Sequence, residues 1–325
     1  MTQHEFDISV CLCTHNPRRE YLTRVLAALA GQSLDPERWE LIVVDNKSEE
    51  SVAQWADLSG IRHARVISEP KLGLTNARVA AIHAADGEVL VFVDDDNVLA
   101  ADYLECACTV MAEKEFLGAI GGKCKGEFEV DPPTWTHHYL QYLAVADHGN
   151  QPLFIHHKNT YLPWYPYGAG LVIRRELARI YVHQLENDPE RRKLDRRGNS
   201  LTSAGDIDMV LTIMDEGHGI GFFPQLSLKH IIPRQRLSFS YLKRLIYHSN
   251  YSLYHLMLSR HIAFHPRPWP LTYITSVLLC LMHRKWHPLT LMLACQAARG
   301  RYAALHDHNQ SVAARKTMLE RSESL

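Results

Sequence analysis

The sequence predicts an α/β fold in which a mostly parallel sheet is flanked by helices and followed by a C-terminal helical extension. Short apolar segments rich in β-branched residues alternate with segments whose apolar residues recur at helical spacing. This alternation is typical of parallel sheets with right-handed helical crossovers. Several apolar segments also run directly into polar or acidic residues, which places those residues at the carboxyl ends of buried strands.

Composition narrows the class of protein. The chain has 325 residues, enough for one large domain or two smaller ones. Lys and Arg number 35 against 36 Asp and Glu, so the overall charge does not favour a nucleic acid as partner. The seven cysteines show no CxxC spacing, and the N-terminal residues lack an apolar signal core. Both observations favour free thiols and a cytoplasmic location.

The first half of the chain alternates regularly between the two kinds of segment. Apolar runs predict strands at 8–13, 39–44, 64–67 and 89–93, and helical spacing predicts helices at 19–30, 52–55 and 74–85. An Asn-Pro step breaks the first strand, and Gly73 precedes the third helix. This half therefore predicts repeated strand–helix units.

The second half is less regular. It predicts helices at 103–113, 175–185 and 206–216 and strands at 119–125, 171–173, 220–223 and 226–230. Residues 126–162 are rich in proline, histidine and aromatic residues and predict a long loop that covers a substrate. The highly charged run 187–199 predicts a solvated loop, and the pattern beyond residue 240 is helical to the end.

Three consecutive carboxylates follow the most apolar strand, Val89–Val93. Negative charges this close repel one another strongly in a site shielded from water, so a positive charge must offset them. A divalent metal ion is the simplest candidate. If the strand continued, Asp94 and Asp96 would lie on one face and Asp95 on the other.

Polar groups follow two other strands of the predicted sheet. Thr14 comes after the first strand and Asp45 after the second. Because ligands bind beyond the carboxyl ends of strands in such sheets, these groups and Asp94–Asp96 are expected to meet at one edge. The sequence therefore predicts a single site there.

Several familiar sites are excluded by particular residues. The turn after the first strand lacks GxGxxG, and the chain contains no GxxxxGK[ST] motif. An EF-hand loop starting at Asp94 would need a small residue where Leu99 stands. A metal-dependent phosphohydrolase with an aspartate nucleophile at the Asp94–Asp96 strand end remains an alternative, although it leaves Asp45 and Asp206 unexplained.

Four segments in this order resemble family-2 glycosyltransferases of the GT-A fold: Thr14-His15-Asn16, Val43-Val44-Asp45-Asn46, Gly73-Leu74-Thr75-Asn76-Ala77-Arg78 and Asp94-Asp95-Asp96. The resemblance covers residues 8–247. It implies an inverting, hexosyltransferase-type enzyme that moves a sugar from a UDP-, GDP- or dTDP-sugar to an acceptor hydroxyl, in polysaccharide or glycoconjugate biosynthesis. A non-catalytic binding protein of the same fold is a second alternative.

The resemblance also implies roles for residues on the donor side. Asp45 would accept a hydrogen bond from the nucleobase, Arg78 would face the diphosphate, and Asp94 would contact the ribose. Asp95 would either support this site or be oriented away from it. Asp96, with His230, would hold Mg²⁺ or Mn²⁺ against the leaving diphosphate. The nucleotide-sugar site implied in full is Thr14, Asn16, Asp45, Asn46, Gly73, Arg78, Asp94 and Asp95.

On the acceptor side, inverting transfer needs a base for the acceptor hydroxyl. Relatives carry a Glu-Asp pair at the start of a late helix. Here Asp206 matches the base, and Gly205 stands in place of the glutamate. Trp164, Tyr167 and Gly168 are candidate acceptor contacts, since sugars stack on aromatic faces.

The resemblance divides the chain into a catalytic domain over 1–239, with a nucleotide-binding half (1–125) and an acceptor-side half (126–239), and a helical region over 240–325. That last region contains two apolar runs, 271–282 and 289–295, each too short to span a bilayer. Tryptophan, arginine and lysine residues flank them, as at lipid–water boundaries.

We therefore expect a helical hairpin that lies on the cytoplasmic face of the membrane as a peripheral contact. A saccharide or lipid-linked saccharide acceptor would be presented there. The alternative is that both helices pack on the catalytic domain.

Overall fold

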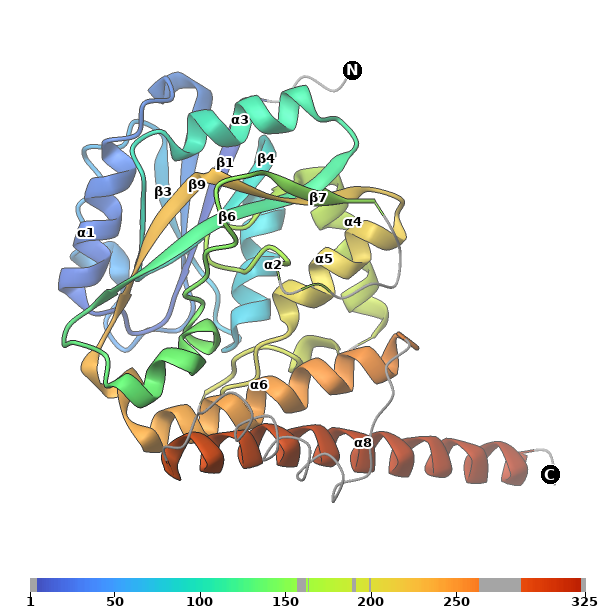
Figure 1. Cartoon of the computed structure of the whole chain (residues 1–325). Helices are drawn as coiled ribbons and strands as arrows, with labels where there is room; N and C mark the ends of the chain where they lie inside the picture. The colour runs from blue at the N-terminus through green and yellow to red at the C-terminus, as the bar shows by residue number, and fades with distance from the viewer. Residues whose placement is uncertain are drawn as a thin grey trace.

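The computed structural model describes residues 5–156, 162, 164–188, 191–198, 200–262 and 288–322. Within these residues, one sheet of nine strands forms the centre of the molecule, with the order β3-β2-β1-β4-β8-β6-β9-β5 and β7 paired with β9 (Figure 1). Helices cover both faces of this sheet. The predicted α/β fold class is confirmed.

The parallel half of the sheet comes from the first part of the chain. It consists of β3 (Ala64–Ser68), β2 (Trp39–Asp45), β1 (Phe6–Thr14) and β4 (Gly87–Asp94), all pairing in parallel. In this register Thr14 lies beside Asp45, and Cys13 lies beside Asp94. The polar ends of the strands are therefore level with one another at one edge.

The other half of the sheet is mixed. Strand β8 (Val172–Arg174) runs antiparallel between β4 and β6 (Leu117–Phe128), and β6 pairs in parallel with β9 (Gly219–Ile232). The two strands predicted at 220–223 and 226–230 are thus one strand. Two three-residue strands were not predicted, β5 (Asn97–Leu99) and β7 (Leu153–Ile155), because each is too short to show alternation.

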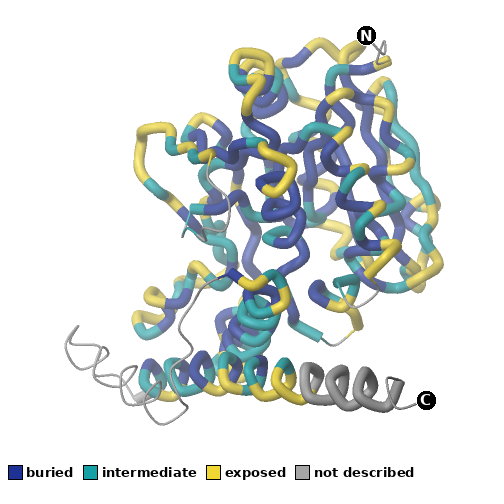
Figure 2. Tube along the Cα trace, turned by 90° about the vertical axis from the view of Figure 1, so that its right-hand side faces the viewer, coloured by how far each residue is buried: buried dark blue, intermediate teal, exposed yellow. Residues whose placement is uncertain are grey.

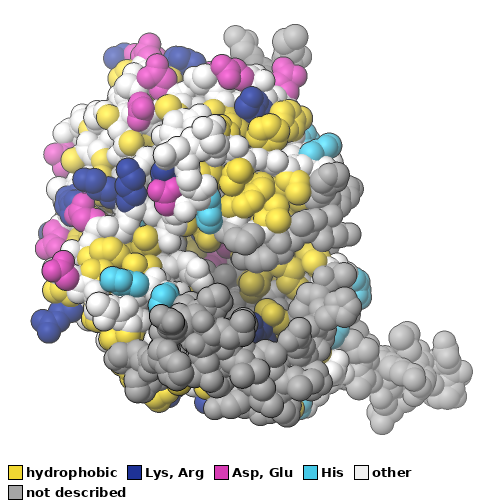
Figure 3. All heavy atoms as spheres, in the orientation of Figure 1, with side chains coloured by type: hydrophobic (Ala, Val, Ile, Leu, Met, Phe, Trp, Pro, Cys, Tyr) yellow, Lys and Arg dark blue, Asp and Glu magenta, His cyan; other side chains and the backbone are white. Residues whose placement is uncertain are grey.

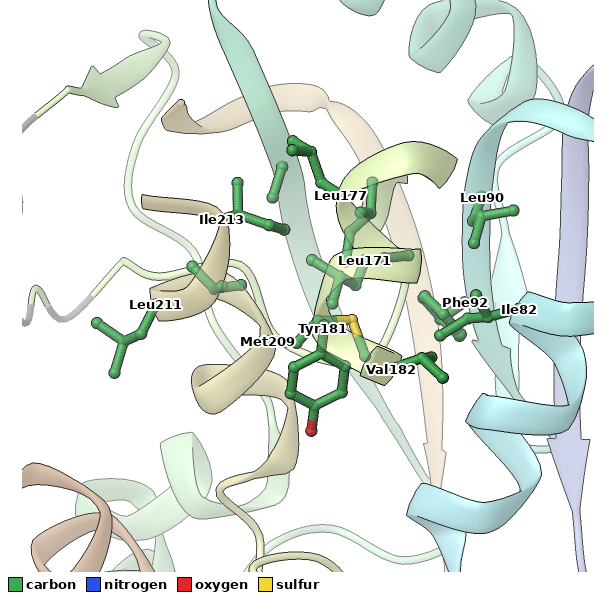
Figure 4. Close-up of a cluster of buried hydrophobic side chains, with 14 of the residues drawn as sticks. Ile82, Leu90, Phe92, Leu171, Leu177, Tyr181, Val182, Met209, Leu211 and Ile213 are labelled. Atoms are coloured by element: carbon green, nitrogen blue, oxygen red, sulfur yellow. The ribbon is translucent and has the colours of Figure 1, made fainter. Parts of the chain in front are cut away.

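Two apolar layers hold the helices to the sheet. Alternate residues of β1 point to opposite faces, with Cys11 and Cys13 in one layer and Val10 and Leu12 in the other. Helices α2 (Leu74–Ala84), α4 (Arg175–Asn187) and α5 (Gly205–Asp215) cover the first face (Figure 4). Helices α1 (Arg19–Ala30) and α3 (Tyr103–Glu113) cover the second. Strands β1, β2 and β4 are almost completely buried between them, and buried chain fills the centre of the molecule (Figure 2).

The predicted helix at 52–55 is wrong, since this stretch forms only a 3₁₀ turn, η2 (Val52–Gln54). The other 3₁₀ segments are η1 (Pro36–Arg38), η3 (Thr134–Leu143), η4 (Arg191–Lys193) and η5 (Arg234–Leu237). One of them, η3, lies within the long loop predicted at 126–162.

Two helices in the described part of the C-terminal region lie side by side, α6 (Phe239–Ser259) and α8 (Pro288–Ser322) (Figures 1 and 2). Leu293 of α8 packs into one cluster with Leu242 and Ile246 of α6. The helices approach so closely that a Cβ on Gly300 would lie 2.3 Å from the carbonyl oxygen of Tyr247. The apolar run 289–295 is therefore held by α6.

The other apolar run, 271–282, lies outside the described residues. Among the helices that the structure describes, none is long and apolar enough to cross a membrane. Acidic and basic side chains are mixed on the face shown in Figure 3, in keeping with their nearly equal numbers in the sequence.

Candidate active site

The carboxyl ends of the parallel strands open into a cavity of about 710 Å³. Most of the residues predicted for the site line this cavity. They are Thr14, Asn46, Gly73, Arg78, Asp94, Asp95, Asp96, Tyr167, Gly168, Asp206 and His230. Residues up to 216 positions apart, Thr14 and His230, are thus brought to one place, as expected for an edge where strand ends converge.

Asp45 and Asn16 lie beside the cavity but do not line it. The carboxylate of Asp45 accepts hydrogen bonds from the backbone amides of Ser48 and Val52, both at 3.0 Å. Burial opposes ionisation, but these hydrogen bonds hold the pKa of Asp45 below its ordinary value. Asn16 is exposed, and its side chain accepts from the amide of Glu49. Both residues shape the turn after β2.

Asn46 fixes the turn that leads into α2. Its amide nitrogen donates to the carbonyl oxygens of Glu69 (3.0 Å) and Lys71 (2.9 Å), and its side-chain oxygen accepts from the amide of Gly73 (2.8 Å). Gly73 adopts φ +139°, a backbone conformation that side chains rarely permit, so glycine is required at this position. This turn sets the position of Arg78, one turn into the helix.

The three carboxylates do not alternate as a continuing strand would require. Strand β4 ends at Asp94, and Asp95 and Asp96 form the turn before β5, so all three line the same cavity. Thr14 donates a hydrogen bond to Asp95. Burial and the charge of Asp96 raise the pKa of Asp95 to about 7. The prediction that Asp95 faces away is therefore wrong.

Asp96 has a positive partner that the sequence did not reveal. The guanidinium Nη1 of Arg236 lies 3.0 Å from Asp96 Oδ2 and 3.1 Å from His230 Nε2. The carboxylate of Asp96 and the ring of His230 are themselves 3.4 Å apart. Although burial works in the opposite direction, His230 and Arg236 hold the pKa of Asp96 well below its ordinary value. Repulsion among Asp94, Asp95 and Asp96 required a positive charge nearby, and Arg236 supplies one.

The pair formed by Asp96 and His230 also fits a divalent ion. Among the described residues, no group of three or more His, Cys, Asp or Glu side chains could hold a metal on its own. Mg²⁺ and ions like it, however, commonly take one or two protein ligands and complete their shell with phosphate oxygens and water. The second ring nitrogen of His230, Nδ1, is buried without a hydrogen-bond partner. Arg236 would have to move aside for an ion to reach Asp96.

Arg78 is buried and paired with an aspartate from the charged run 187–199. Its Nη1 lies 2.9 Å from Asp195 Oδ2, and both side chains are less than a tenth exposed. Burial lowers the pKa of Arg78, but the carboxylates of Asp195, Asp206 and Asp94 raise it above its ordinary value. The prediction of a solvated loop is wrong for Leu194 and Asp195, which are buried, whereas Arg197 and Gly198 are exposed at the edge of the cavity.

Asp206 lies in the first turn of α5 and lines the same cavity as the acidic turn. Its Oδ2 accepts from the amide of Gly168 (2.8 Å), and its Oδ1 accepts from the amide of Ile207 (2.9 Å). The side chain is half-buried at the cavity wall. Negative charge is favoured at a helix N-terminus, and each oxygen keeps a further lone pair for a hydrogen bond.

A network of ion pairs fixes the helix that carries Asp206. Asp208 is fully buried and accepts from Nε of Arg191 and from Nε of Arg260, both at 2.8 Å. The two guanidinium groups also donate to the hydroxyl of Thr212. Arg191 belongs to η4 and Arg260 follows the last residue of α6, so Asp208 joins these two segments to α5.

Residues 141–148, Tyr167 and side chains of α6 also line the cavity. Asn250 of α6 donates to the hydroxyl of Tyr142 at 3.0 Å, which ties the helix to η3. Burial and the charge of Asp206 raise the pKa of Tyr167 to about 12. Trp164 does not line the cavity but packs against the apolar layer of α4 and α5. Residues 141–148 of the predicted loop 126–162 line the cavity, and that this loop covers a substrate stays a prediction.

Three comparisons with known proteins bear on this site. A family model described as Glycosyl transferase family 2 matches residues 9–178, more than half of the chain. A search among curated proteins finds no significant match. Among solved structures, TarS of S. aureus, residues 1–349, is 17% identical with a TM-score of 0.47, and the alignment covers 94% of this chain and 92% of that one.

A second solved structure is the mannosyltransferase PcManGT of Pyrobaculum calidifontis, in complex with GDP-Man and Mn²⁺. It is 16% identical with a TM-score of 0.54, and the alignment covers 90% of this chain and 86% of that chain. At this identity the likeness shows a shared fold. Together with the family match, it confirms the GT-A architecture expected from the strand-end motifs. The chain is a glycosyltransferase and belongs to glycosyl transferase family 2.

Proposed function

We propose that this protein is an inverting transferase that moves a hexosyl group from a nucleoside diphosphate to an acceptor hydroxyl, with Asp206 as the general base, in polysaccharide or glycoconjugate biosynthesis. One observation carries the proposal: Asp206 shares a single cavity with the acidic turn Asp94–Asp96. A cavity of about 710 Å³ that holds both a general base and a diphosphate site has room for the reacting sugar.

The donor occupies the side of the cavity formed by the strand ends in this proposal. The nucleotide lies along Thr14 and the Asn46–Gly73 turn. Asp45 is near the nucleobase, Asp94 is at the ribose, and Asp95 has a supporting role. Arg78 offers a buried positive charge toward the diphosphate. The mannosyltransferase of similar fold binds GDP-Man, which agrees with a donor of this class.

The ligands of a divalent ion would be Asp96 and His230, with the remaining ligands from the diphosphate and water. A bound Mn²⁺ or Mg²⁺ would stabilise the negative charge on the leaving diphosphate. Arg236 lies at the same two side chains, so its guanidinium would be displaced toward the diphosphate when an ion binds.

The transfer step needs one bond to form as another breaks. The acceptor hydroxyl loses its proton to Asp206, and its oxygen bonds to the anomeric carbon on the face opposite the nucleotide. The bond between that carbon and the diphosphate oxygen breaks, and the nucleoside diphosphate leaves with the electron pair. Configuration at the anomeric carbon is therefore inverted. Tyr167, Gly168 and α6 border the space left for the acceptor, with Trp164 behind them.

A thermal-shift panel tests the donor class. We expect one of UDP, GDP and dTDP to stabilise the protein, and to do so more strongly with MnCl₂, since a ligand at about 100 times its Kd adds roughly 2.7 kcal/mol to stability. Asp96→Ala should lose the manganese-dependent part of the shift. Asp131→Asn, a change at an exposed residue outside the cavity, serves as the control.

Two results of this panel would contradict the proposal in different ways. Equal shifts in Asp96→Ala and the unaltered protein would remove Asp96 from the metal site. No shift with any of the three nucleotides would argue against a nucleoside diphosphate donor.

We also propose that residues 240–325 follow the catalytic residues 1–239 as a helical region, whose helix α6 lines part of the cavity, and that this region brings the protein to a membrane surface bearing a lipid-linked acceptor. Lys243 and Arg244 of α6 are exposed, as such contact requires. Two aromatic residues of α6, by contrast, make contacts within the protein. The Tyr251 hydroxyl donates to Asp307 at 2.8 Å, and Arg301 lies over the ring of Tyr254.

Liposome flotation tests this membrane contact. The full chain should float with vesicles containing anionic lipid and stay in solution with purely zwitterionic vesicles, because Lys and Arg near the surface are attracted to anionic lipid. A chain that ends before α8 is a poor comparison with the full chain, because the loss of α8 would expose the apolar side chains of α6. Lys243→Glu with Arg244→Glu is the better variant. If the unaltered chain fails to float at low salt, the acceptor is a soluble saccharide.

A further inference from the structure

The backbone at Gly205 lies against the carboxylate of Asp195. An ideal Cβ on Gly205 would be 2.5 Å from Oδ2, 2.9 Å from Cγ and 3.1 Å from Cβ of Asp195. Heavy atoms do not approach a Cβ this closely, so any side chain at residue 205 would displace Asp195. Glycine at the position that carries a glutamate in relatives is therefore coupled to an aspartate from the preceding loop.

Asp195 is held firmly in this place. Its Oδ1 accepts from the amide of Arg196 (3.0 Å), and its backbone oxygen accepts from the hydroxyl of Thr202 (2.8 Å). The amide of Ala204 donates to the carbonyl oxygen of Leu194 (3.0 Å), which folds the loop back onto the start of α5. The side chain is only 5% exposed.

The carboxylate of Asp195 in turn fixes the guanidinium that faces Asp206. Its Oδ2 lies 2.9 Å from Arg78 Nη1. The other end nitrogen, Nη2, reaches the backbone of Gly168, where a Cβ would be 2.4 Å from Nη2 and 3.3 Å from Asp206 Oδ2. Arg78 thus lies between Asp195 and Asp206, with the ring of Phe92 beneath it.

We propose that Asp195 is a positioning residue for sugar transfer: it supplies, from the loop before α5, the carboxylate that residue 205 lacks, and it holds Arg78 between the base and the donor. Gly205 is glycine because it must admit this carboxylate. The inference rests on the proposed function, since it takes Asp206 as the base and the diphosphate as the partner of Arg78.

An exchange of the two residues tests the relation between them. Asp195→Asn and Gly205→Glu alone should each lower the transfer rate on the order of 10²-fold, because a shift of about 1 Å in a positioned group has that effect. The double variant Asp195→Gly/Gly205→Glu restores a carboxylate beside Arg78 and should recover at least a tenth of the original rate. Asp131→Asn and Gly31→Glu are matched controls, since a Cβ on Gly31 meets nothing closer than 3.6 Å.

The rate is measured as release of nucleoside diphosphate from the nucleotide sugar whose base the thermal-shift panel selects. A double variant no faster than the slower single variant, although folded by thermal melting, would overturn the proposal. None of these variants changes Asp206. A failed rescue would therefore contradict the role of Asp195 alone. An undiminished rate in Asp206→Asn would instead contradict the role of Asp206 as the base.

The pH profile separates a positioning role from a purely structural one. The groups that face Asp206 are Arg78 from α2, Asp195 from the loop and Tyr167 before β8. In Asp195→Asn the charge of Arg78 is no longer opposed, which stabilises ionised Asp206. The acidic limb of kcat/KM should therefore move to lower pH in this variant. An unmoved limb would contradict the proposal.

Discussion

Replacing Asp206 with asparagine is expected to lower the transfer rate by roughly 10²–10⁴-fold, the range that a positioned general base contributes. Asparagine is nearly isosteric and its amide oxygen can still accept from the amide of Gly168, so the wall of the cavity should keep its shape. What it cannot do is take the proton of the acceptor hydroxyl. Donor binding should remain nearly unchanged, because the hydrogen bonds of Asp206 go to the amides of Gly168 and Ile207, and neither residue is proposed to hold the donor.

The measurement is nucleoside diphosphate release with saturating donor, with binding followed separately by thermal shift. Asp131→Asn should match the unaltered protein in both. A variant that retained full activity would remove Asp206 from the mechanism. Asp208 could not take its place, since it is fully buried and both of its carboxylate oxygens accept from arginines.

Asp208→Asn should lower the free energy of unfolding by about 3–5 kcal/mol, the usual cost of removing one member of a buried ion pair. Asp208 is the common partner of Arg191 and Arg260, whose side chains are each only 15% exposed. Loss of its charge leaves two guanidinium groups partly buried without an acceptor of full charge. The free energy of unfolding of folded proteins is only about 5–15 kcal/mol in total, so this loss is a large fraction of it.

Urea denaturation checks this value, and the chain offers a matched control. Asp215 also pairs with Arg260, at 2.6 Å, but its side chain is 46% exposed. Asp215→Asn should cost less than about 1 kcal/mol, as expected for a surface ion pair. Similar losses for both variants would show that burial of the Asp208 network does not contribute as argued.

The sequence predicted those parts of the site that local pattern determines. Thr14 and Asp94 follow apolar strands, and the register of β1 with its neighbours brings those strand ends level, as expected. The face assigned to Asp95 was wrong because strand alternation stops where β4 stops, at Asp94. A pattern rule gives the direction of a side chain only while the regular element continues.

Long-range partners were not predictable from pattern. Repulsion among the three carboxylates correctly required a positive charge, but only the fold shows that Arg236 lies there. Likewise, the run 187–199 reads as a solvated loop because its composition is charged, whereas Asp195 is buried by a partner, Arg78, that lies 117 residues away. The signal that could have indicated this pair was the glycine at residue 205, next to the expected base.

The Asp208 network has a mechanical consequence. Arg260 links the end of α6 to α5 through its ion pair with Asp208. The helix that borders the acceptor space and the helix that carries Asp206 are therefore fixed to each other. Helix α5 is itself packed into the apolar layer that covers the sheet, together with α2, which carries Arg78. The acceptor wall, the base and the buried guanidinium therefore depend on one continuous set of contacts. A substitution at the end of α6 should reach the base through Arg260, although Arg260 lies outside the cavity.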